Sequence, residues 1–211
     1  MKKIGLMIFT IIIFAGCQKE LADYTTNPSD PGNTGGNDST AVNLLKGSWN
    51  FDSLHLDSKD SSFVNVDTFS TLTVTTLNYT SFGNNGTLII DDSLFKFNNY
   101  TYSISTTGNA TIYEDGVFVN NTDFPFVYYV PPANSVANYK LITSDSLYFP
   151  EGDFAVADTS TTSKPYGLTF KVDSTSLVFT QKINIDSTYE NAGLIYHTKI
   201  NGIGNLYFHK N

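Results

Sequence analysis

The chain has 211 residues, and its 20 acidic residues outnumber 12 lysines, with no arginine, which gives a formal net charge of −8. This charge excludes electrostatic nucleic-acid binding, because contacts to phosphates need a basic surface. The single cysteine excludes a disulfide framework and any metal site built from several cysteines. Packing and backbone hydrogen bonds must therefore hold the folded part together.

Residues 1–16 have the three-part pattern of an export signal. Met1 to Lys3 form a basic start, an apolar run extends from Ile4 to Ala15, and Gly16 directly precedes Cys17. The apolar run is shorter than the ~20 residues that a membrane-spanning helix needs. We therefore predict a cleaved signal peptide rather than a permanent membrane span.

The segment Phe14-Ala15-Gly16-Cys17 resembles the lipobox of bacterial lipoproteins, in which signal peptidase II cuts before a cysteine that becomes diacylglyceryl-modified and N-acylated. The resemblance implies lipidation of Cys17 with palmitate-type chains, and several such chains anchor a protein firmly to a membrane. Gln18-Lys19-Glu20 resembles the export signals of Bacteroidota surface lipoproteins. The expected location is the outer membrane, facing the periplasm or the cell surface.

Residues 17–41 are predicted to be the lipidated cysteine and a flexible tether. The stretch from Ala22 to Thr40 is rich in Asn, Thr, Gly, Pro, Ser and Asp, and this composition buries too little apolar surface to order itself. Asp38-Ser39-Thr40 resembles the O-glycosylation sequon of Bacteroides and its relatives, so Ser39 is the expected glycosylation site. Other Asp-Ser pairs fit turns in which the aspartate bonds its own backbone, at Asp52, Asp92, Asp145, Asp173 and Asp186.

Residues 42–211 form the body of the chain. Apolar and polar side chains alternate there, which is typical of antiparallel strands with one buried face, and helical periodicity is nearly absent. We predict strands at residues 49–56, 64–82, 87–90, 94–104, 110–119, 124–130, 139–149, 166–172, 177–185 and 194–208.

Turn-forming residues separate these segments. We predict turns at Gly83–Gly86, Asn120-Asn121, Pro131-Pro132, Asn191–Gly193 and Asn201-Gly202. The apolar parity changes inside two segments, between Phe51 and Leu54 and near Thr75-Thr76, and a β-bulge would produce either change. The pattern predicts one all-β domain: an antiparallel up-and-down barrel of about 8–10 strands, with a β-sandwich as the alternative.

The domain opens with Leu44-Leu45-Lys46-Gly47-Ser48-Trp49, a possible helical turn followed by Gly-x-Trp on the first strand. This opening resembles the lipocalin-like domains of Bacteroidota lipoproteins. The resemblance implies that Trp49 closes one barrel end, that Gly47 lets the backbone pass close to it, and that a basic residue on the last strand packs over the indole. Lys210 is the residue that can supply this cation.

The sequence predicts no catalytic, metal or cofactor site. His55, His197 and His209 lie in separate strand segments, and no two of them form a visible ligand pair. The neighbouring carboxylates Asp91-Asp92 and Glu114-Asp115 would point to opposite faces of a strand, so they fit turns and strand ends better than a glycosidase pair. We therefore predict that the protein is not an enzyme.

The aromatic residues carry the remaining functional signal. Six tyrosines on alternating strand segments are candidates for lining a barrel mouth, although a core would use the same residues. They are Tyr100, Tyr102, Tyr128, Tyr139, Tyr166 and Tyr196. We predict a lipid-anchored envelope protein that holds a small, partly apolar ligand in its barrel. The alternative is a β-sandwich surface module that binds a protein or glycan partner.

Overall fold

The computed structural model describes residues 43–66, 68–150 and 166–211, most of which lie in strands. A single helical turn occupies residues 43–45. The ten strands are β1 (Gly47–Val66), β2 (Phe69–Thr80), β3 (Phe82–Ile90), β4 (Leu94–Glu114), β5 (Val117–Asn138), β6 (Lys140–Thr143), β7 (Ser146–Phe149), β8 (Tyr166–Val172), β9 (Ser176–Asn191) and β10 (Leu194–Lys210). Within the described ranges, no helix has the length and apolarity to cross a membrane.

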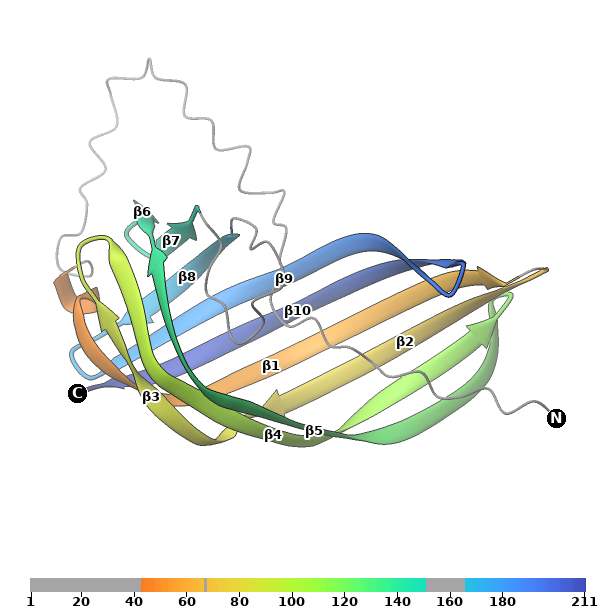
Figure 1. Cartoon of the computed structure of the whole chain (residues 1–211), viewed down its shortest axis with the longest axis horizontal. Helices are drawn as coiled ribbons and strands as arrows, with labels where there is room; N and C mark the ends of the chain where they lie inside the picture. The colour runs from red at the N-terminus through yellow and green to blue at the C-terminus, as the bar shows by residue number, and fades with distance from the viewer. Residues whose placement is uncertain (1–42, 67, 151–165) are drawn as a thin grey trace, which may run out of the picture.

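All ten strands belong to one antiparallel sheet, which follows the order of the chain (Figure 1). β2 and β3 act as one bent strand, because β1 and β4 each pair with both of them. β5 continues through Tyr139 into β6, which pairs with β7. With these two joins, the ten strands form a ring of eight that β10 closes by pairing with β1. The predicted antiparallel up-and-down barrel is confirmed.

The ring turns a corner where β1 meets the break between β2 and β3. The β1–β10 register shifts between Phe51 and Ser53, which is the first of the two predicted irregularities. Opposite this bulge, the Leu54 N–H donates to Ser81 Oγ over 2.8 Å and the Ser81 N–H donates to Leu54 O over 2.8 Å. Asn84 Nδ2 donates to Asp52 O over 2.6 Å. The bulge bends β1, and side-chain hydrogen bonds satisfy the backbone groups that it displaces.

Several predicted turns are wrong because the strands run through them. Asn120-Asn121 and Pro131-Pro132 lie inside β5, and Asn201-Gly202 lies inside β10, which pairs with both β1 and β9 at that point. β5 tolerates its prolines because, among the described residues, it pairs with β4 on one side only. Gly83–Gly86 is an irregular part of β3 with two register shifts, not a turn.

Two of the actual hairpin turns have two residues each with positive φ: Asp115-Gly116, at 47° and 79°, and Ala192-Gly193, at 52° and 77°. These values fit type I′ turns, whose twist matches that of the flanking strands. The sequence pattern predicts the turn at Asn191–Gly193 correctly, but it wrongly predicts a strand through Asp115-Gly116. The bulge predicted near Thr75-Thr76 is absent, because the β1–β2 register is unbroken there. Leu72 and Val74 face the side of β2 opposite to Leu77 and Tyr79 instead.

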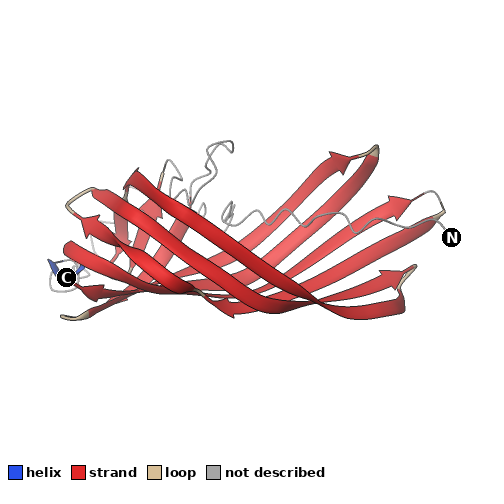
Figure 2. Ribbon diagram, turned by 60° about the horizontal axis from the view of Figure 1, so that its bottom comes forward, coloured by secondary structure: helices blue, strands red, loops and turns tan. Residues whose placement is uncertain are grey.

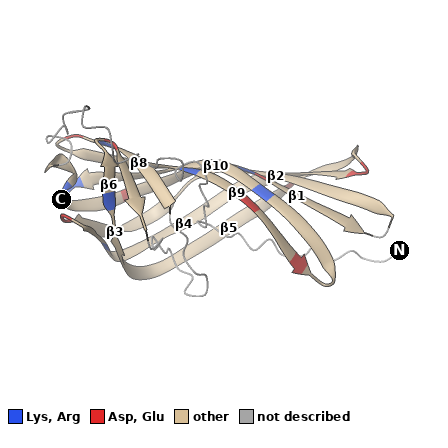
Figure 3. Cartoon of the chain, turned by 90° about the horizontal axis from the view of Figure 1, so that it is seen from above, with Lys and Arg blue, Asp and Glu red and all other residues tan. Residues whose placement is uncertain are grey.

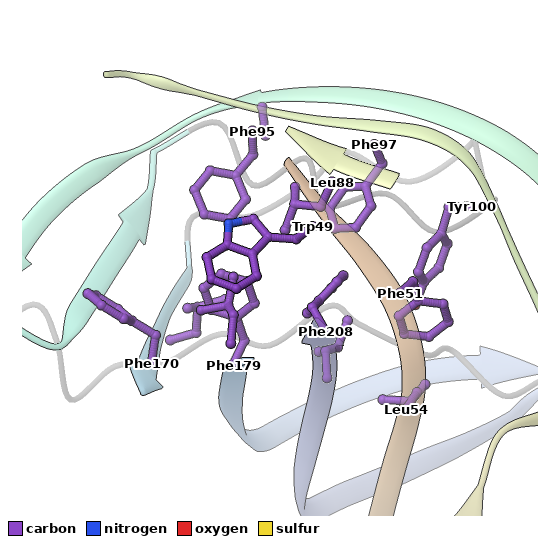
Figure 4. Packing of buried hydrophobic residues seen from close by; sticks show 14 of the residues in the cluster. Trp49, Phe51, Leu54, Leu88, Phe95, Phe97, Tyr100, Phe170, Phe179 and Phe208 are labelled. Atoms are coloured by element: carbon purple, nitrogen blue, oxygen red, sulfur yellow. The ribbon is translucent and has the colours of Figure 1, made fainter. Parts of the chain in front are cut away.

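One end of the ring is closed and filled with aromatic side chains (Figure 4). Trp49 is fully buried, and the ring centres of Phe95 and Phe179 lie 5.5 Å apart. Phe208 bridges this group to Phe51, with ring centres 5.8 Å from Phe179 and 5.5 Å from Phe51. Edge-to-face and tilted contacts at these distances are the favourable arrangement for aromatic rings. The closed end therefore supplies the hydrophobic core.

The other end is an open, curved sheet (Figure 2). β8 pairs with β9 only as far as Thr180, and the short strands β6 and β7 do not extend beyond the closed end. The remaining strands continue in the order β5, β4, β2, β1, β10, β9. We call the side of this open part that continues from the core its inner face.

Candidate binding face

The inner face can be followed row by row, because residues paired across antiparallel strands point to the same side. Leu54 and Leu56 of β1 belong to the core, so alternation places Ser58, Asp60 and Ser62 on the inner face. Three rows cross β9, β10, β1 and β2 in that order: Ile183–Gly202–Ser58–Leu77, Ile185–Ile200–Asp60–Thr75 and Ser187–Thr198–Ser62–Thr73. These rows lie directly beyond the core.

The rows place a polar stripe between two apolar flanks. β1 and β2 supply hydroxyl groups and the Asp60 carboxyl along the middle. Ile183, Ile185 and Ile200 lie on the β9–β10 side. On the other side, β5 places Phe124 opposite Gly108 and Phe126 opposite Thr106, and both phenylalanines are half-buried. A face with this pattern can bind a molecule that is partly apolar and partly polar.

Asp60 is the charged group in the middle of this face. Its Oδ1 atom is buried and has no hydrogen-bond partner among the described residues. Desolvation raises the pKa of its carboxyl from the ordinary 3.8 to about 6. Its neighbours in sequence, Asp57 and Lys59, are exposed on the outer side of β1. A half-buried carboxylate without a partner costs stability, so it marks a candidate functional group.

A second polar group lies where the inner face meets the core. The hydroxyls of Tyr79, Tyr100 and Tyr102 are buried, and none has a hydrogen-bond partner within the described part of the chain. Burial raises the pKa of all three phenols, and the charged form of each of Tyr100 and Tyr102 would be disfavoured further by neighbouring tyrosines. These tyrosines are neutral hydrogen-bonding groups at neutral pH. Thr198 Oγ1, on β10, is likewise buried and unpartnered within the described residues.

The six tyrosines singled out from the sequence separate into two groups. Tyr100, Tyr102, Tyr139 and Tyr166 are buried members of the aromatic core. Tyr139 donates its hydroxyl proton to Asp91 O over 2.7 Å. Tyr128 is exposed on β5, and Tyr196 stacks on Tyr189 near the open end of β10 with ring centres 5.1 Å apart. The structure therefore does not bring the six together around one barrel mouth.

Gly47, Trp49 and Lys210 meet at the closed end. Lys210 Nζ lies 4.1 Å from the centre of the Trp49 ring and donates to Lys46 O over 2.9 Å. The indole Nε1–H donates to Leu45 O over 2.9 Å. Gly47 has a φ of 130°, and a Cβ there would lie 2.8 Å from Lys210 Nζ. Only glycine therefore leaves room for the lysine to reach the indole and the carbonyl together.

Charged residues are sparse along the strands (Figure 3). Strand alternation places the histidines and most of the charged strand residues on the outer face. His55 contacts Thr80 Oγ1, His197 contacts Thr188 Oγ1, and His209 contacts Asp52 Oδ1. No group of three or more potential metal-ligating side chains occurs among the residues that the structure describes.

Three of the Asp-Ser pairs lie in turns, but of these three aspartates only Asp173 bonds its own backbone as predicted, within the described residues. In the turn of Asp92-Ser93 the accepting carboxyl is that of Asp91, and Asp145 accepts from Thr143 Oγ1. Asp91 Oδ1 accepts the N–H groups of Ser93 and Leu94, and Asp173 Oδ1 accepts those of Thr175 and Ser176. The backbone hydrogen bonds lower the pKa of the Asp91 carboxyl. The pKa of the Asp173 carboxyl is lowered first by the Ser176 hydroxyl, which donates to Asp173 Oδ2, and then by the backbone N–H groups. The Asp92 and Asp173 pairs lie in these turns, and the Asp145 pair lies in the β6–β7 turn, whereas Asp52 and Asp186 lie within strands. The predicted lipidation at Cys17 and glycosylation at Ser39 lie outside the described residues.

Sequence reasoning missed Asp60. The stretch from Asp57 to Ser62 is polar, and the predicted strands leave out residues 57–63, although these residues are the middle of β1. The alternation of side chains along a strand could have located Asp60, because it places residues 58, 60 and 62 on the same face as Leu54 and Leu56. A strand that leaves the core and continues along an open sheet keeps its alternation but loses its apolar residues.

Comparisons with known proteins assign no family to the chain. No protein-family model matches it, and no curated protein matches it significantly. A solved structure that matches is Ail, the attachment invasion locus protein of Yersinia pestis, at 8% identity over 78% of this chain and 99% of that one. The TM-score is 0.19, which is too low to support a conclusion about fold or function.

Proposed function

We propose that the protein is a lipid-anchored envelope protein that binds a small, partly apolar ligand on the inner face of its open sheet. The observation that carries this proposal is the polar stripe between apolar flanks, with buried polar atoms of Asp60 and Thr198 that lack partners in the described part of the chain. A buried polar group is costly unless it is paired, and a ligand can provide the pairing. The aromatic core does not serve this role, because its rings contact one another. The proposed role is binding and not catalysis.

The test uses an uncharged fluorescent amphiphile, N-phenyl-1-naphthylamine, and a matched pair of variants on β1. Ser62 lies on the inner face and Ser61 on the outer face. We expect Ser62→Trp to weaken probe binding at least ~10-fold, because the indole covers the polar stripe, while Ser61→Trp leaves binding unchanged. Equal effects of the two variants, or no probe binding by the unaltered protein, would reject the proposal.

The membrane anchor is part of the same proposal and has its own test. Cys17 is the proposed site of lipidation, and the outer membrane is the proposed location. The mature protein purified from its native envelope should begin at Cys17 and carry the mass of a diacylglyceryl group and an amide-linked acyl chain. A further glycan mass on a peptide that contains Ser39 would support glycosylation. A protein that retains residues 1–16 would contradict the anchor.

A protein partner is the second candidate, and one observation favours it. β5 is the most exposed of the long strands. At its first end lie three apolar residues with large exposed fractions: Val117 at 68%, Phe118 at 57% and Val119 at 50%. An exposed apolar edge strand can accept a strand from another protein. If this edge is the functional surface, Val119→Lys should abolish partner binding while binding of the probe to the inner face is unaffected.

A further inference from the structure

Asp60 lies in surroundings that lack a compensating positive charge. On the inner face, the other charged strand residues that the structure describes are Glu114, at the hairpin end of β4, and Lys210, which lies over Trp49 at the closed end. Lys59 and Lys199 are exposed on the outer face. No salt bridge to Asp60 is formed within the described residues. No positively charged side chain of the described residues therefore balances the negative charge of Asp60 in this region.

The side chains around Asp60 are uncharged hydroxyl groups or apolar groups. Thr75 and Ile200 pair with Asp60 across β2 and β10. Thr198 lies two residues from Ile200 on β10, and its hydroxyl is buried with no hydrogen-bond partner in the described ranges. Ser58 and Ser62 flank Asp60 on the same face of β1. A carboxylate with hydroxyl oxygens nearby can accept the three N–H donors of a primary ammonium group.

The apolar flanks fit the rest of such a ligand. Ile185 and Ile200 continue the row of Asp60 toward β9, and Ile183 and Leu77 lie in the next row toward the core. Leu56 of β1 pairs with Tyr79 of β2. The distance along β1 from Asp60 to Leu56 is roughly 13 Å at the rise of a strand. An alkyl or aromatic group attached to the ammonium therefore has apolar surface on the path to the core.

We propose that Asp60 recognises the positively charged amine of an amphiphilic ligand whose apolar part lies against the isoleucines of β9 and β10. This inference rests on the proposed function, because it names the chemical class of the ligand on the same face. Charge complementarity supports it: an ionised carboxylate in a half-buried, mostly neutral environment attracts a cation more strongly than it would in water. An anionic ligand would face repulsion at the same place.

The experiment compares octan-1-amine, octan-1-ol and octanoate as competitors of N-phenyl-1-naphthylamine at pH 7.5. These three probes share a chain and differ in the charge of the head group. For the unaltered protein we expect the amine to bind about 10- to 100-fold more tightly than the alcohol, which is the range for one charged hydrogen-bonded contact, and octanoate to bind most weakly.

Two variants on neighbouring positions of β1 provide the control. Asp60→Asn should bind the amine and the alcohol equally well, because it keeps the shape of the side chain and removes its charge. Asp57→Asn removes a charge from the outer face of the same strand and should retain the full preference for the amine. The denaturation midpoint of each variant verifies that it is folded, and the comparison among the three ligands on the unaltered protein does not depend on either variant.

The possible outcomes separate the two proposals. Equal displacement of the probe by the amine and the alcohol, or tighter binding of octanoate, overturns the amine inference and leaves the binding face in place. A preference for the amine that survives in Asp60→Asn also overturns it. No binding of the probe or of any competitor overturns both proposals. Loss of the preference in Asp60→Asn alone supports the inference.

Discussion

The two halves of β1 show how one strand serves two purposes. In its first half, the residues directed inward are Trp49, Phe51, Leu54 and Leu56, and all are buried in the core. In its second half, the same face carries Ser58, Asp60 and Ser62. The backbone pairing with β10 continues through both halves. The closed end therefore supplies stability, and the open end can carry polar groups because it does not have to form the core.

The largest effect on stability should come from the closed end. Trp49→Ala removes a fully buried indole together with its hydrogen bond to Leu45 O and its contact with Lys210. We expect the free energy of unfolding to fall by about 3–5 kcal/mol, as for other buried Trp and Phe truncations. Urea denaturation followed by far-UV circular dichroism measures it. A loss below about 1 kcal/mol would mean that the aromatic core does not dominate stability.

Glycines at the two ends should differ in their tolerance of a methyl group. Gly86 has a φ of 128°, and a Cβ there would lie 2.8 Å from Tyr100 Cα, whereas Gly193, with a φ of 77°, has nothing within 4 Å of that position. Gly86→Ala combines backbone strain with a steric clash, and we expect a loss of about 2–4 kcal/mol. Gly193→Ala has the strain alone, and we expect about 1 kcal/mol. Equal losses in denaturation experiments would show that the packing around Gly86 is loose.

Asp60 should make stability fall as pH rises. Its pKa is raised to about 6 in the folded protein, so between pH 4 and 6 the folded state binds more protons than the unfolded state. The contribution is fully present below the unfolded pKa and is lost as the pH rises through 6. It amounts to about 1–2 kcal/mol once solvent screening is allowed for. Asp60→Asn should remove this slope, while Asp57→Asn should retain it, as measured by denaturation between pH 4 and 8.

The smallest effect should come from the end of the open sheet. Tyr196 is half-buried, and its ring stacks on Tyr189 at an interplanar angle of 6°. Tyr196→Ala removes one stacked pair and little core area, so we expect a loss of about 0.5–1.5 kcal/mol in the same urea denaturation. A loss as large as that of Trp49→Ala would contradict the division between a stabilising closed end and an open end that contributes little.

The sequence predicts the core better than the open sheet. Alternation of apolar residues identified Trp49–Leu56 and Tyr166–Val172 as strands, and the parity change after Phe51 located a real bulge. The same reasoning failed for residues 57–63, because a strand outside the core needs no apolar residues. It also failed for Asn201-Gly202, because backbone pairing with β1 on one side and β9 on the other keeps this glycine within β10. Local preferences for turns are weak compared with these long ladders.

The candidate site was harder to predict than the fold. The tyrosines were the visible aromatic signal, yet four of the six became core because ring burial is favourable wherever the sheet closes. Asp60 acquires its unusual environment from Ile200 and Thr75, which lie 140 and 15 residues away in sequence. Such a juxtaposition depends on the register of three strands, which a single sequence does not specify.

The most direct test of this account is a map of the backbone amide NMR shifts of the protein during titration with N-phenyl-1-naphthylamine. The account predicts that the perturbed amides cluster on residues 58–64 of β1 and 196–202 of β10, with residues 47–54 at the closed end unaffected. Perturbations centred on residues 47–54 would place the ligand within the aromatic core and contradict the division between the two ends.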